Sequence, residues 1–409
     1  MNLVVIGAQW GDEGKGRIVD YMASAADVVI RFSGGANAGH TLVYQGQKYA
    51  VHLVPSGILY PDTTVLLGTG MVIDPESLFD ELNTLSEQGI DWKGRVLISS
   101  RAHIVFPEYK ERDRRLDKER KRPIGTTGRG IGIAYSQKAA RDGIRLADIF
   151  DDSWKEVLSD EENRFLDLYR DQLSDMMVDI TSYLHREKPE RVLMEGAQGA
   201  LLDLDLGTYP YVSSGYSAAA GASLGAGIGP RDIDGVLGVF KAYSTRVGNG
   251  PFPSEFLPER DGELGEQIQT IGKEFGVTTG RKRRCGYLDL VALKYACRAN
   301  GIDGLVLTKL DIYDGFDEVS ACTAYDIDGT QTDEFPASID ALTNAGPVIK
   351  TFPGWKRDIS GITEYDQLPE EARRYIEFIE EYCETPITVV SVGPERNQII
   401  IRRELWTEY

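Results

Sequence analysis

The chain has 409 residues, of which 42% are hydrophobic and 27% are charged, an ordinary composition for a globular protein with a large core. Acidic residues outnumber basic ones by 64 to 45, and the net charge of -19 argues against nucleic acid as the main partner, because phosphate backbones bind basic surfaces. The 4 cysteines are too sparse for a disulfide framework and favour a reducing compartment.

The N-terminal residues lack the basic start and the long apolar stretch of a signal peptide. No apolar run is long enough to span a bilayer. We therefore expect a soluble, cytoplasmic protein that binds neither membrane nor nucleic acid.

Short apolar runs alternate with helical patterns, which predicts an α/β fold with a large, mostly parallel central sheet flanked by helices. The first run, Leu3–Gly7, leads into a glycine-rich turn and then a helix, an order that aims backbone N–H groups at phosphate as in P-loop GTPases. The length allows two or three domains, but large α/β enzymes often form one, and residues 1–409 are predicted to form a single domain. We expect further strands at Asp27–Phe32, Thr64–Gly68, Val96–Ser99, Arg191–Met194, Val236–Phe240, Gly304–Thr308 and Thr388–Val392, and a helix at Pro75–Glu87.

Between residues 152 and 187, apolar side chains recur at helical spacing among charged ones. This pattern predicts an amphipathic helix that covers the sheet or a neighbouring subunit. The charge-rich run Lys110–Arg122 is typical of a solvated helix or loop.

The first glycine-rich turn, residues 11–16, reads GDEGKG and resembles a phosphate-binding loop without the complete Walker spacing. Lys15 and the backbone could cradle a phosphate, while Asp12 could accept a proton or bind a metal ion. The alternative is a solvated turn between a strand and a helix.

Two further glycine-rich segments follow buried or charged runs. Residues 33–41 contain His40, whose imidazole could stabilise a developing oxyanion beside a phosphate, although a single histidine is often structural. Residues 124–132 combine Thr126, Thr127 and Arg129 with glycines, which suits an anion.

The segment Thr278–Arg284 holds four consecutive cations, for which an anionic ligand or a basic surface turn would account. Thr308-Lys309-Leu310-Asp311 follows an apolar strand and resembles the guanine-specifying motif of GTPases, in which the carboxylate accepts hydrogen bonds that adenine cannot donate. Residues 391–394 follow another strand and could complete the pocket for the base.

Together these segments resemble the adenylosuccinate synthetase family nearly from end to end. The shared stretches are QWGDEGKG at 9–16, GGANAGHT at 34–41, HLVPSGIL at 52–59, IGTTGRGIG at 124–132, EGAQG at 195–199, DLGTYPYVSS at 205–214, KAYSTRVGNGPFP at 241–253, TTGRKRRCGYLD at 278–289 and TKLD at 308–311. The resemblance implies a GTP-dependent ligase that joins L-aspartate to IMP through a 6-phosphoryl-IMP intermediate, giving adenylosuccinate, GDP and phosphate.

The same resemblance implies roles for individual residues. Asp12 would be the base that removes the N1 proton of IMP, His40 the acid at O6, and Lys15 and Gln198 further catalytic groups. Asp12 and the carbonyl of Gly39 would hold one Mg²⁺ per subunit. Residues implied to bind IMP are Asp12, Glu13, Gly14, Lys15, Asn37, Ala38, Gly39, His40, Thr127, Arg141, Gln198, Ser213 and Arg281, with Arg141 donated across a homodimer interface.

Aspartate and GTP are assigned in the same way. The residues implied to bind aspartate are Val277, Thr278, Thr279, Gly280, Arg281 and Arg283. The residues implied to bind GTP are Gly11, Asp12, Glu13, Gly14, Lys15, Gly16, Gly39, His40, Thr41, Arg283, Lys309, Asp311, Ser391 and Gly393.

Some features depart from the family's usual pattern. Ser213 stands where many relatives have threonine, and residues 215–221 replace hydroxyl and amide groups with alanines beside the nucleotide pocket. Some phage relatives use dGMP to make 2-amino-deoxyadenylosuccinate and often lack the carboxylate at the position of Asp12. The chain keeps Asp12, which favours IMP and leaves the dGMP reaction as the alternative. A GTPase-like switch that uses Thr308–Asp311 is a third possibility, but the sequence argues against it because the remaining loops would have no role in a simple switch.

Overall fold

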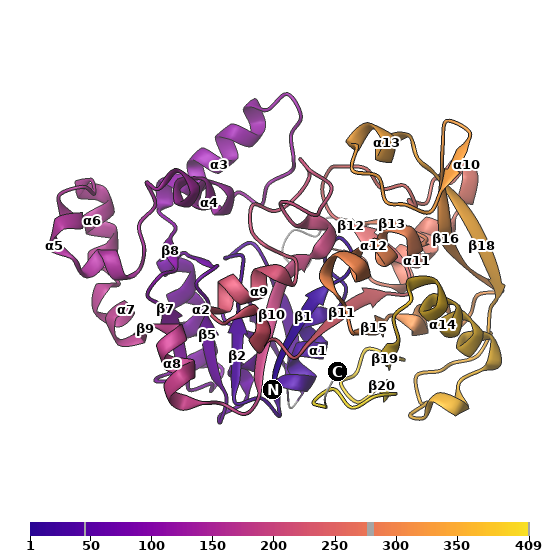
Figure 1. The fold of residues 1–409 in the computed structure, drawn as a ribbon, viewed down its shortest axis with the longest axis horizontal. Helices are drawn as coiled ribbons and strands as arrows, with labels where there is room; N and C mark the ends of the chain where they lie inside the picture. The colour runs from indigo at the N-terminus through magenta and orange to yellow at the C-terminus, as the bar shows by residue number, and fades with distance from the viewer. Residues whose placement is uncertain (45, 276–281, 408–409) are drawn as a thin grey trace. The chain divides into compact units, whose positions relative to one another are not determined.

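The computed structural model describes residues 1–44, 46–275 and 282–407 (Figure 1). The chain divides into two compact units, each built from three stretches of sequence. The first unit comprises Met1–Val5, Gly16–Gln198 and Ser213–Asp234, and the second comprises Ile6–Lys15, Gly199–Val212 and Gly235–Tyr409. The single domain expected for residues 1–409 stays a prediction.

The predicted parallel sheet is confirmed. Ten strands pair in the order β20-β19-β15-β11-β1-β10-β2-β5-β7-β9. Within this sheet, the strand pairs with a described register are parallel apart from the edge pair β19–β20. Each expected strand overlaps an observed one, namely β1 (Asn2–Gly7), β2 (Val28–Arg31), β5 (Thr64–Leu67), β7 (Val96–Ser99), β10 (Val192–Gly199), β11 (Gly235–Lys241), β15 (Gly304–Thr308) and β19 (Ile387–Ser391).

These strands are recognisable in the sequence because both of their faces are covered. Every residue of β2, β11, β15 and β19 is buried, so each strand is a continuous run of mainly apolar residues and does not alternate with polar ones. The two short edge strands are β9 (Met177–Val178) and β20 (Ile399–Ile401).

In the first unit, α2 (Pro75–Glu87) has the predicted bounds, because Asp74 caps its first turn and Pro75 occupies the position after the cap. The charge-rich run lies mostly in α3 (Pro107–Glu119), which packs on α4 (Ile131–Ala140) (Figure 1). The remaining elements are α1 (Lys15–Ala23), α9 (Ala220–Ala226), β3 (His40–Tyr44), β4 (Gln47–Val51), β6 (Val72–Ile73) and β8 (His103–Ile104).

The single amphipathic helix expected at residues 152–187 is wrong. The segment forms α5 (Asp152–Lys155), α6 (Asp160–Asp167), α7 (Arg170–Met176), β9 and α8 (Ile180–Glu187). In Figure 1, α5 and α6 lie at the left edge of the view, while α7 and β9 lie beside β7. A capping box between Ser159 and Glu162 starts α6, and the side chain of Asp179 caps α8. Between α7 and α8, Met177 pairs with Ile98 of β7, so two residues of the expected helix instead form the edge strand β9.

In the second unit, a smaller sheet has the order β14-β16-β17, and β18 also pairs with β16. The long strands β16 (Glu318–Ile327) and β18 (Gly346–Pro353) run side by side in Figure 1. The other elements are β12 (Ser244–Arg246), β13 (Arg284–Gly286), β14 (Leu288–Asp289), β17 (Thr330–Thr332), α10 (Pro258–Asp261), α11 (Leu264–Ile271), α12 (Leu290–Asn300), α13 (Ile339–Asn344) and α14 (Glu370–Cys383). None of the helices in the described residues has the length and apolar character needed to cross a membrane.

Candidate active site

In the second unit, the loop from Gly11 to Lys15 connects β1 to α1. Gly11 and Gly14 have φ values of 90° and 86°, and Asp12 lies between them with φ of 60°. The left-handed region is costly for a residue with a side chain, and such strain is concentrated at functional sites. The loop therefore presents the Asp12 carboxylate in a conformation that the surrounding structure has to enforce.

The side chain of Glu13 is buried and supports this loop through hydrogen bonds to its backbone. Its Oε1 accepts hydrogen bonds from the N–H of Gln9 at 3.1 Å and of Gly11 at 2.8 Å, and burial raises the pKa of its carboxyl group. A Cβ on Gly7 would lie 2.2 Å from Glu13 Oε2, so only glycine leaves room for the carboxylate. Any contact of Glu13 with a nucleotide therefore has to come from its backbone.

The Asp12 carboxylate forms an ion pair with Arg283 in the same unit. Arg283 Nε lies 2.7 Å from Asp12 Oδ2, and Arg283 Nη1 lies 2.8 Å from Oε2 of Glu274. Burial alone would raise the pKa of Glu274, but the cations of Lys241 and Arg283 and the hydroxyl of Tyr243 lower it to about 2. One guanidinium is thus shared between two carboxylates.

The guanine motif lies at the carboxyl ends of neighbouring parallel strands. Lys309 and Asp311 follow β15, while Gly393 follows β19, whose last residue is Ser391, and these two strands pair directly. Lys309 has φ of 62°, and its Nζ donates to the carbonyl of Gly272 at 3.0 Å. Parallel strands bring such residues to one edge of the sheet, where ligands of open α/β sheets bind.

Thr308 joins the guanine motif to the phosphate loop. Its hydroxyl donates to the carbonyl of Glu13 at 2.6 Å and to that of Phe240 at 3.1 Å. A side chain on Gly14 would have its Cβ 3.6 Å from Thr308 Oγ1. The two motifs that the sequence assigns to one nucleotide are therefore in contact within the second unit.

In the first unit, His40 is held by a buried carboxylate. His40 Nδ1 lies 3.0 Å from Oε1 of Glu195, which also accepts hydrogen bonds from the backbone and hydroxyl of Ser56 at 2.9 and 3.0 Å. Burial alone would raise the pKa of Glu195, but the interactions with His40, Ser56 and Arg31 lower it. The carboxylate fixes the ring and leaves Nε2 available for chemistry.

The glycine at the end of the phosphate loop lies against the same histidine. A Cβ on Gly16 would lie 2.9 Å from Cγ of His40, closer than real side chains approach. Glycine at this position therefore allows the start of α1 and the imidazole to touch.

The loop before His40 is shaped by short backbone contacts. Asn37 Oδ1 accepts from the N–H of Gly35 at 3.2 Å, and Arg31 Nη2 donates to the carbonyl of Gly35 at 2.9 Å. The carbonyl of Ala38 lies 3.0 Å from His52 Nδ1. Gly39 follows as an exposed residue, and Thr41 lies exposed in β3.

Gln198 shows two signs of a ligand-binding residue. Its φ is 57°, and both polar atoms of its side-chain amide are buried without a hydrogen-bond partner in the described residues. Buried polar groups are normally satisfied, so an orphaned amide next to a strained backbone indicates a ligand.

Two acidic residues of α3 organise the loop at residues 124–130. Asp117 accepts from the backbone N–H groups of Ile124, Gly125 and Thr126 at 3.0 to 3.2 Å. Asp113 accepts from the hydroxyl of Thr126 and the N–H of Gly130, each at 3.0 Å. These bonds leave the exposed Thr127 at the tip of the loop.

Arg141 and Ser213 are the remaining predicted site residues that the structure describes. Arg141 is exposed and caps the end of α4 with φ of 71°. Ser213 Oγ accepts from the N–H of Gly215 at 3.5 Å. Val277, Thr278, Thr279, Gly280 and Arg281 lie outside the described residues.

The structure also identifies residues that the motifs did not. Glu195, Glu274, Asp113 and Asp117 each hold a predicted site residue or loop, Glu195 from a distant part of the sequence and the other three from nearby segments. The only sequence signal for Glu195 was its place in the EGAQG stretch, and Glu274 had none.

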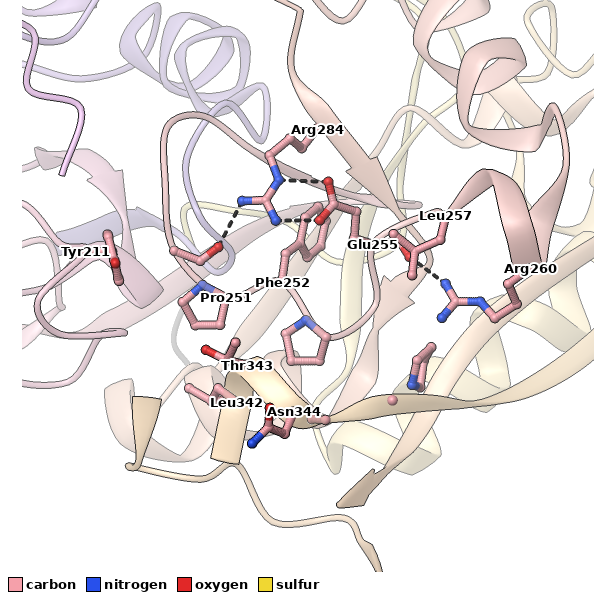
Figure 2. Close-up of a pocket in the computed structure, with 15 residues that line it drawn as sticks. Tyr211, Pro251, Phe252, Glu255, Leu257, Arg260, Arg284, Leu342, Thr343 and Asn344 are labelled. Atoms are coloured by element: carbon pink, nitrogen blue, oxygen red, sulfur yellow. Dashed lines mark hydrogen bonds and ion pairs between the residues drawn. The ribbon is translucent and has the colours of Figure 1, made fainter. Parts of the chain in front are cut away.

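Two cavities lie in the second unit. One of about 440 Å³ is drawn in Figure 2, where Arg284 and Glu255 point toward each other and form a double contact. None of the predicted site residues lines it. The other, of about 230 Å³, has Arg283 and Lys282 in its wall.

The donor groups fit a magnesium ion that arrives with a nucleotide. Within the described residues, no cluster of three or more histidine, cysteine, aspartate or glutamate side chains could hold a metal by itself. Mg²⁺ is usually bound by one or two carboxylates together with substrate phosphates and water. Asp12, whose side chain is 38% exposed and lies in a phosphate-type loop, suits that mode.

Parallel strands with glycine-rich loops at their carboxyl ends and a guanine motif define a nucleotide-dependent α/β enzyme. The family model described as adenylosuccinate synthetase matches residues 4–400. The chain belongs to the adenylosuccinate synthetase family, as its sequence motifs predict.

Curated relatives extend over the same length. The adenylosuccinate synthetase of Clostridium novyi is 46% identical over 98% of this chain and 99% of its own. That of Synechococcus elongatus is 47% identical over 98% of this chain and 95% of its own.

Solved structures agree in fold. The structure of fully ligated adenylosuccinate synthetase from Plasmodium falciparum has a TM-score of 0.91 and 38% identity, covering 98% of this chain and 100% of that one. The cyanophage S-2L succinoaminodeoxyadenylate synthetase, PurZ, bound to dGMP and dATP, has a TM-score of 0.65 at 21% identity, covering 98% and 96%. The second similarity shows the fold alone.

Proposed function

We propose that this protein joins the amino group of L-aspartate to C6 of IMP, with GTP as the phosphoryl donor. The products are adenylosuccinate, GDP and phosphate. The observation that carries the proposal is the continuous contact in the second unit from the guanine motif through Thr308 to the loop of Asp12. It supports a guanine nucleotide whose phosphates lie at the residue proposed as the base.

The C6–O bond of IMP is amide-like and has no good leaving group, so the oxygen has to be phosphorylated first. Asp12 removes the N1 proton, which makes O6 nucleophilic toward the γ-phosphate of GTP. Lys15 and the loop backbone hold the phosphates. The amino group of aspartate then attacks C6 and expels phosphate.

His40 donates a hydrogen bond to O6 and to the phosphate that is transferred. Glu195 keeps the imidazole in the orientation that this requires. The unsatisfied amide of Gln198 is proposed to bind the purine of IMP, together with Glu13, Gly14, Asn37, Ala38, Thr127, Ser213 and Arg281.

One Mg²⁺ per subunit, held by Asp12 and the Gly39 carbonyl, would neutralise phosphate charge during the transfer. GTP is further held by Gly11, Gly16, Thr41, Lys309, Asp311, Ser391 and Gly393. Aspartate is held by residues 277–281 and Arg283, of which Arg283 is also near GTP.

The proposed working form is a cytoplasmic homodimer in which Arg141 reaches the IMP phosphate of the neighbouring subunit. Support comes from its exposed place at the end of α4, without a described side-chain partner. The four cysteines are free and buried, which suits a reducing compartment.

Turnover of the purified protein with IMP or dGMP as acceptor and GTP or ATP as donor tests the proposal. We expect adenylosuccinate only when IMP, GTP, aspartate and Mg²⁺ are all present. Turnover with dGMP alone would assign the phage-type reaction. GTP hydrolysis that does not depend on IMP or aspartate would identify a switch protein.

A further inference from the structure

Glu274 is buried beneath the proposed site, where three donors fix its carboxylate. Oε1 accepts from the hydroxyl of Tyr243 at 2.6 Å and pairs with Lys241 Nζ at 3.0 Å, while Oε2 pairs with Arg283 Nη1 at 2.8 Å. The side chains of Glu274 and Lys241 are each 1% exposed. A charge this deeply buried persists only when its partners are fixed, so Glu274 is a rigid point in the unit.

The carboxylate is also anchored to the central sheet. Lys241 is the last residue of β11, and its Nζ donates to Thr245 Oγ1 at 2.6 Å as well as to Glu274. This network therefore connects a fully buried strand to the Arg283 side chain.

The backbone of Arg283 is held on both sides. Its N–H donates to the carbonyl of Glu274 at 3.0 Å, and its carbonyl accepts from Gln269 Nε2 at 2.8 Å. With the backbone and one edge of the guanidinium fixed, few rotamers remain for the side chain. A pre-organised guanidinium loses little entropy when it binds an anion.

The fixed guanidinium still has donors to offer. Nε faces Asp12 and Nη1 faces Glu274, whereas Nη2 has no hydrogen-bond partner within the described residues. The side chain is 14% exposed and borders the cavity of about 230 Å³. A carboxylate that approaches from solvent can bind at this remaining edge.

We propose that Glu274 is the positioning residue of the site, which orients Arg283 so that its free edge meets a carboxylate of aspartate while its Nε pairs with Asp12. This inference rests on the proposed function and deepens it. Glu274 touches no substrate, and its effect is transmitted through Arg283.

Replacement of Glu274 by glutamine tests the proposal, since the shape is kept and the charge is lost. Loss of a charge-assisted contact should raise the KM for aspartate by about tenfold or more. The KM for IMP should change by less than about twofold, because Arg283 is not assigned to IMP.

Glu255→Gln is the matched control. It removes the carboxylate that pairs with Arg284, the residue next to Arg283, in the cavity of Figure 2. Its KM for aspartate should stay within about twofold of wild type, because this pair borders the same cavity of about 230 Å³ but forms no hydrogen bond or ion pair with the side chains of Glu274 or Arg283 in the described residues.

Tyr243→Phe is the milder probe. It removes one hydrogen bond to Glu274 and keeps both ion pairs. We expect a rise in the KM for aspartate of about two- to fivefold with unchanged thermal stability of the nucleotide complex. If Glu274→Gln does not fold because Lys241 is left unpaired, this variant decides the question.

The outcomes separate the two proposals. A wild-type protein that does not consume IMP, GTP and aspartate would end the proposed function itself. An active wild type with a folded Glu274→Gln variant of unchanged KM for aspartate would overturn the positioning role. Equal rises in every KM, or the same rise in Glu255→Gln, would also overturn it by showing general loosening.

Discussion

Several proposed site residues share a backbone conformation that side chains normally avoid. Asp12, Gln198 and Lys309 have φ values of 60°, 57° and 62°. None of them ends an α-helix, whereas Arg141 does, where a left-handed cap is ordinary. The strain therefore supports the proposal that these side chains serve a ligand.

Asp12→Asn should abolish turnover while nucleotide binding is retained, because the shape of the side chain is kept and the base is lost. The expected fall in kcat is about 10³-fold or more. Steady-state kinetics together with GDP and IMP titrations measure both properties. Near-normal turnover would show that another group accepts the proton.

For individual residues, the sequence predicted the site residues that lie in motifs. It did not predict the carboxylates that hold those residues in place. His40 could be predicted as a site residue from its glycine-rich loop, but its partner Glu195 lies 155 residues further along the chain. A charged residue in a sequence carries no direction, so only the fold reveals which carboxylate it meets. The same reason hid Glu274.

Among the elements, buried strands were predictable and short helices were not. β2, β15 and β19 are continuous mainly apolar runs, which the sequence displays directly. The prediction of one continuous helix at residues 152–187 was wrong, because apolar periodicity does not reveal where one helix ends and the next begins. Ser159 and Asp179 each cap the start of a separate helix. In α3, charges expected to be solvated instead support a loop through Asp113 and Asp117.

Asp117→Ala should loosen the loop at residues 124–130 without unfolding the protein. Three backbone N–H groups would exchange Asp117 for water, so the KM for IMP should rise by about five- to tenfold at little cost in stability. Glu119→Ala, an exposed change at the end of the same helix, is the control. Equal effects of the two variants would contradict a supporting role.

The N-terminus of α12 predicts a pH-dependent stability. Asp289 caps the helix through the N–H of Ala292 and accepts from the hydroxyl of Tyr325, and burial raises its pKa from 3.8 to about 6. Between about pH 4 and pH 6, Asp289 therefore holds a proton in the folded protein that it has lost in the unfolded chain. Because the folded-state pKa is raised, this stabilisation is present at low pH and is lost as pH rises through about 4 to 6.

Asp289→Asn mimics the protonated form and should keep the cap. At pH 8 it should be more stable than wild type by about 1–3 kcal/mol, and the difference should shrink as the pH falls toward 5.5. Denaturant unfolding at the two pH values measures this. A difference that does not vary with pH would contradict the raised pKa.

For the whole molecule, the motifs predicted the family and its fold from end to end, because many of them occur in the family's order. The family-model match over residues 4–400 confirms the family, and the TM-score of 0.91 to a solved adenylosuccinate synthetase confirms the fold. The division into two units was not predicted, since each unit is assembled from stretches far apart in sequence. Contacts of that kind leave no mark in local composition.

Arg141→Leu should weaken IMP binding by about tenfold or more, because a phosphate would lose a charged partner. If Arg141 is donated between subunits, a mixture of this variant with Asp12→Asn should regain activity, since hybrids contain one intact site. Rates measured before and after mixing test this. A mixture no more active than its components would place Arg141 in its own subunit's site.

The interleaving of the two units has a practical consequence. The boundary between them falls inside β1, after Val5, and recurs between Lys15 and Gly16, so neither unit corresponds to a continuous gene fragment. Truncation, domain exchange between relatives, or expression of one half would remove a strand or the phosphate loop from the other. Recombination within this lineage should therefore succeed only with whole coding sequences or at surface turns inside one unit.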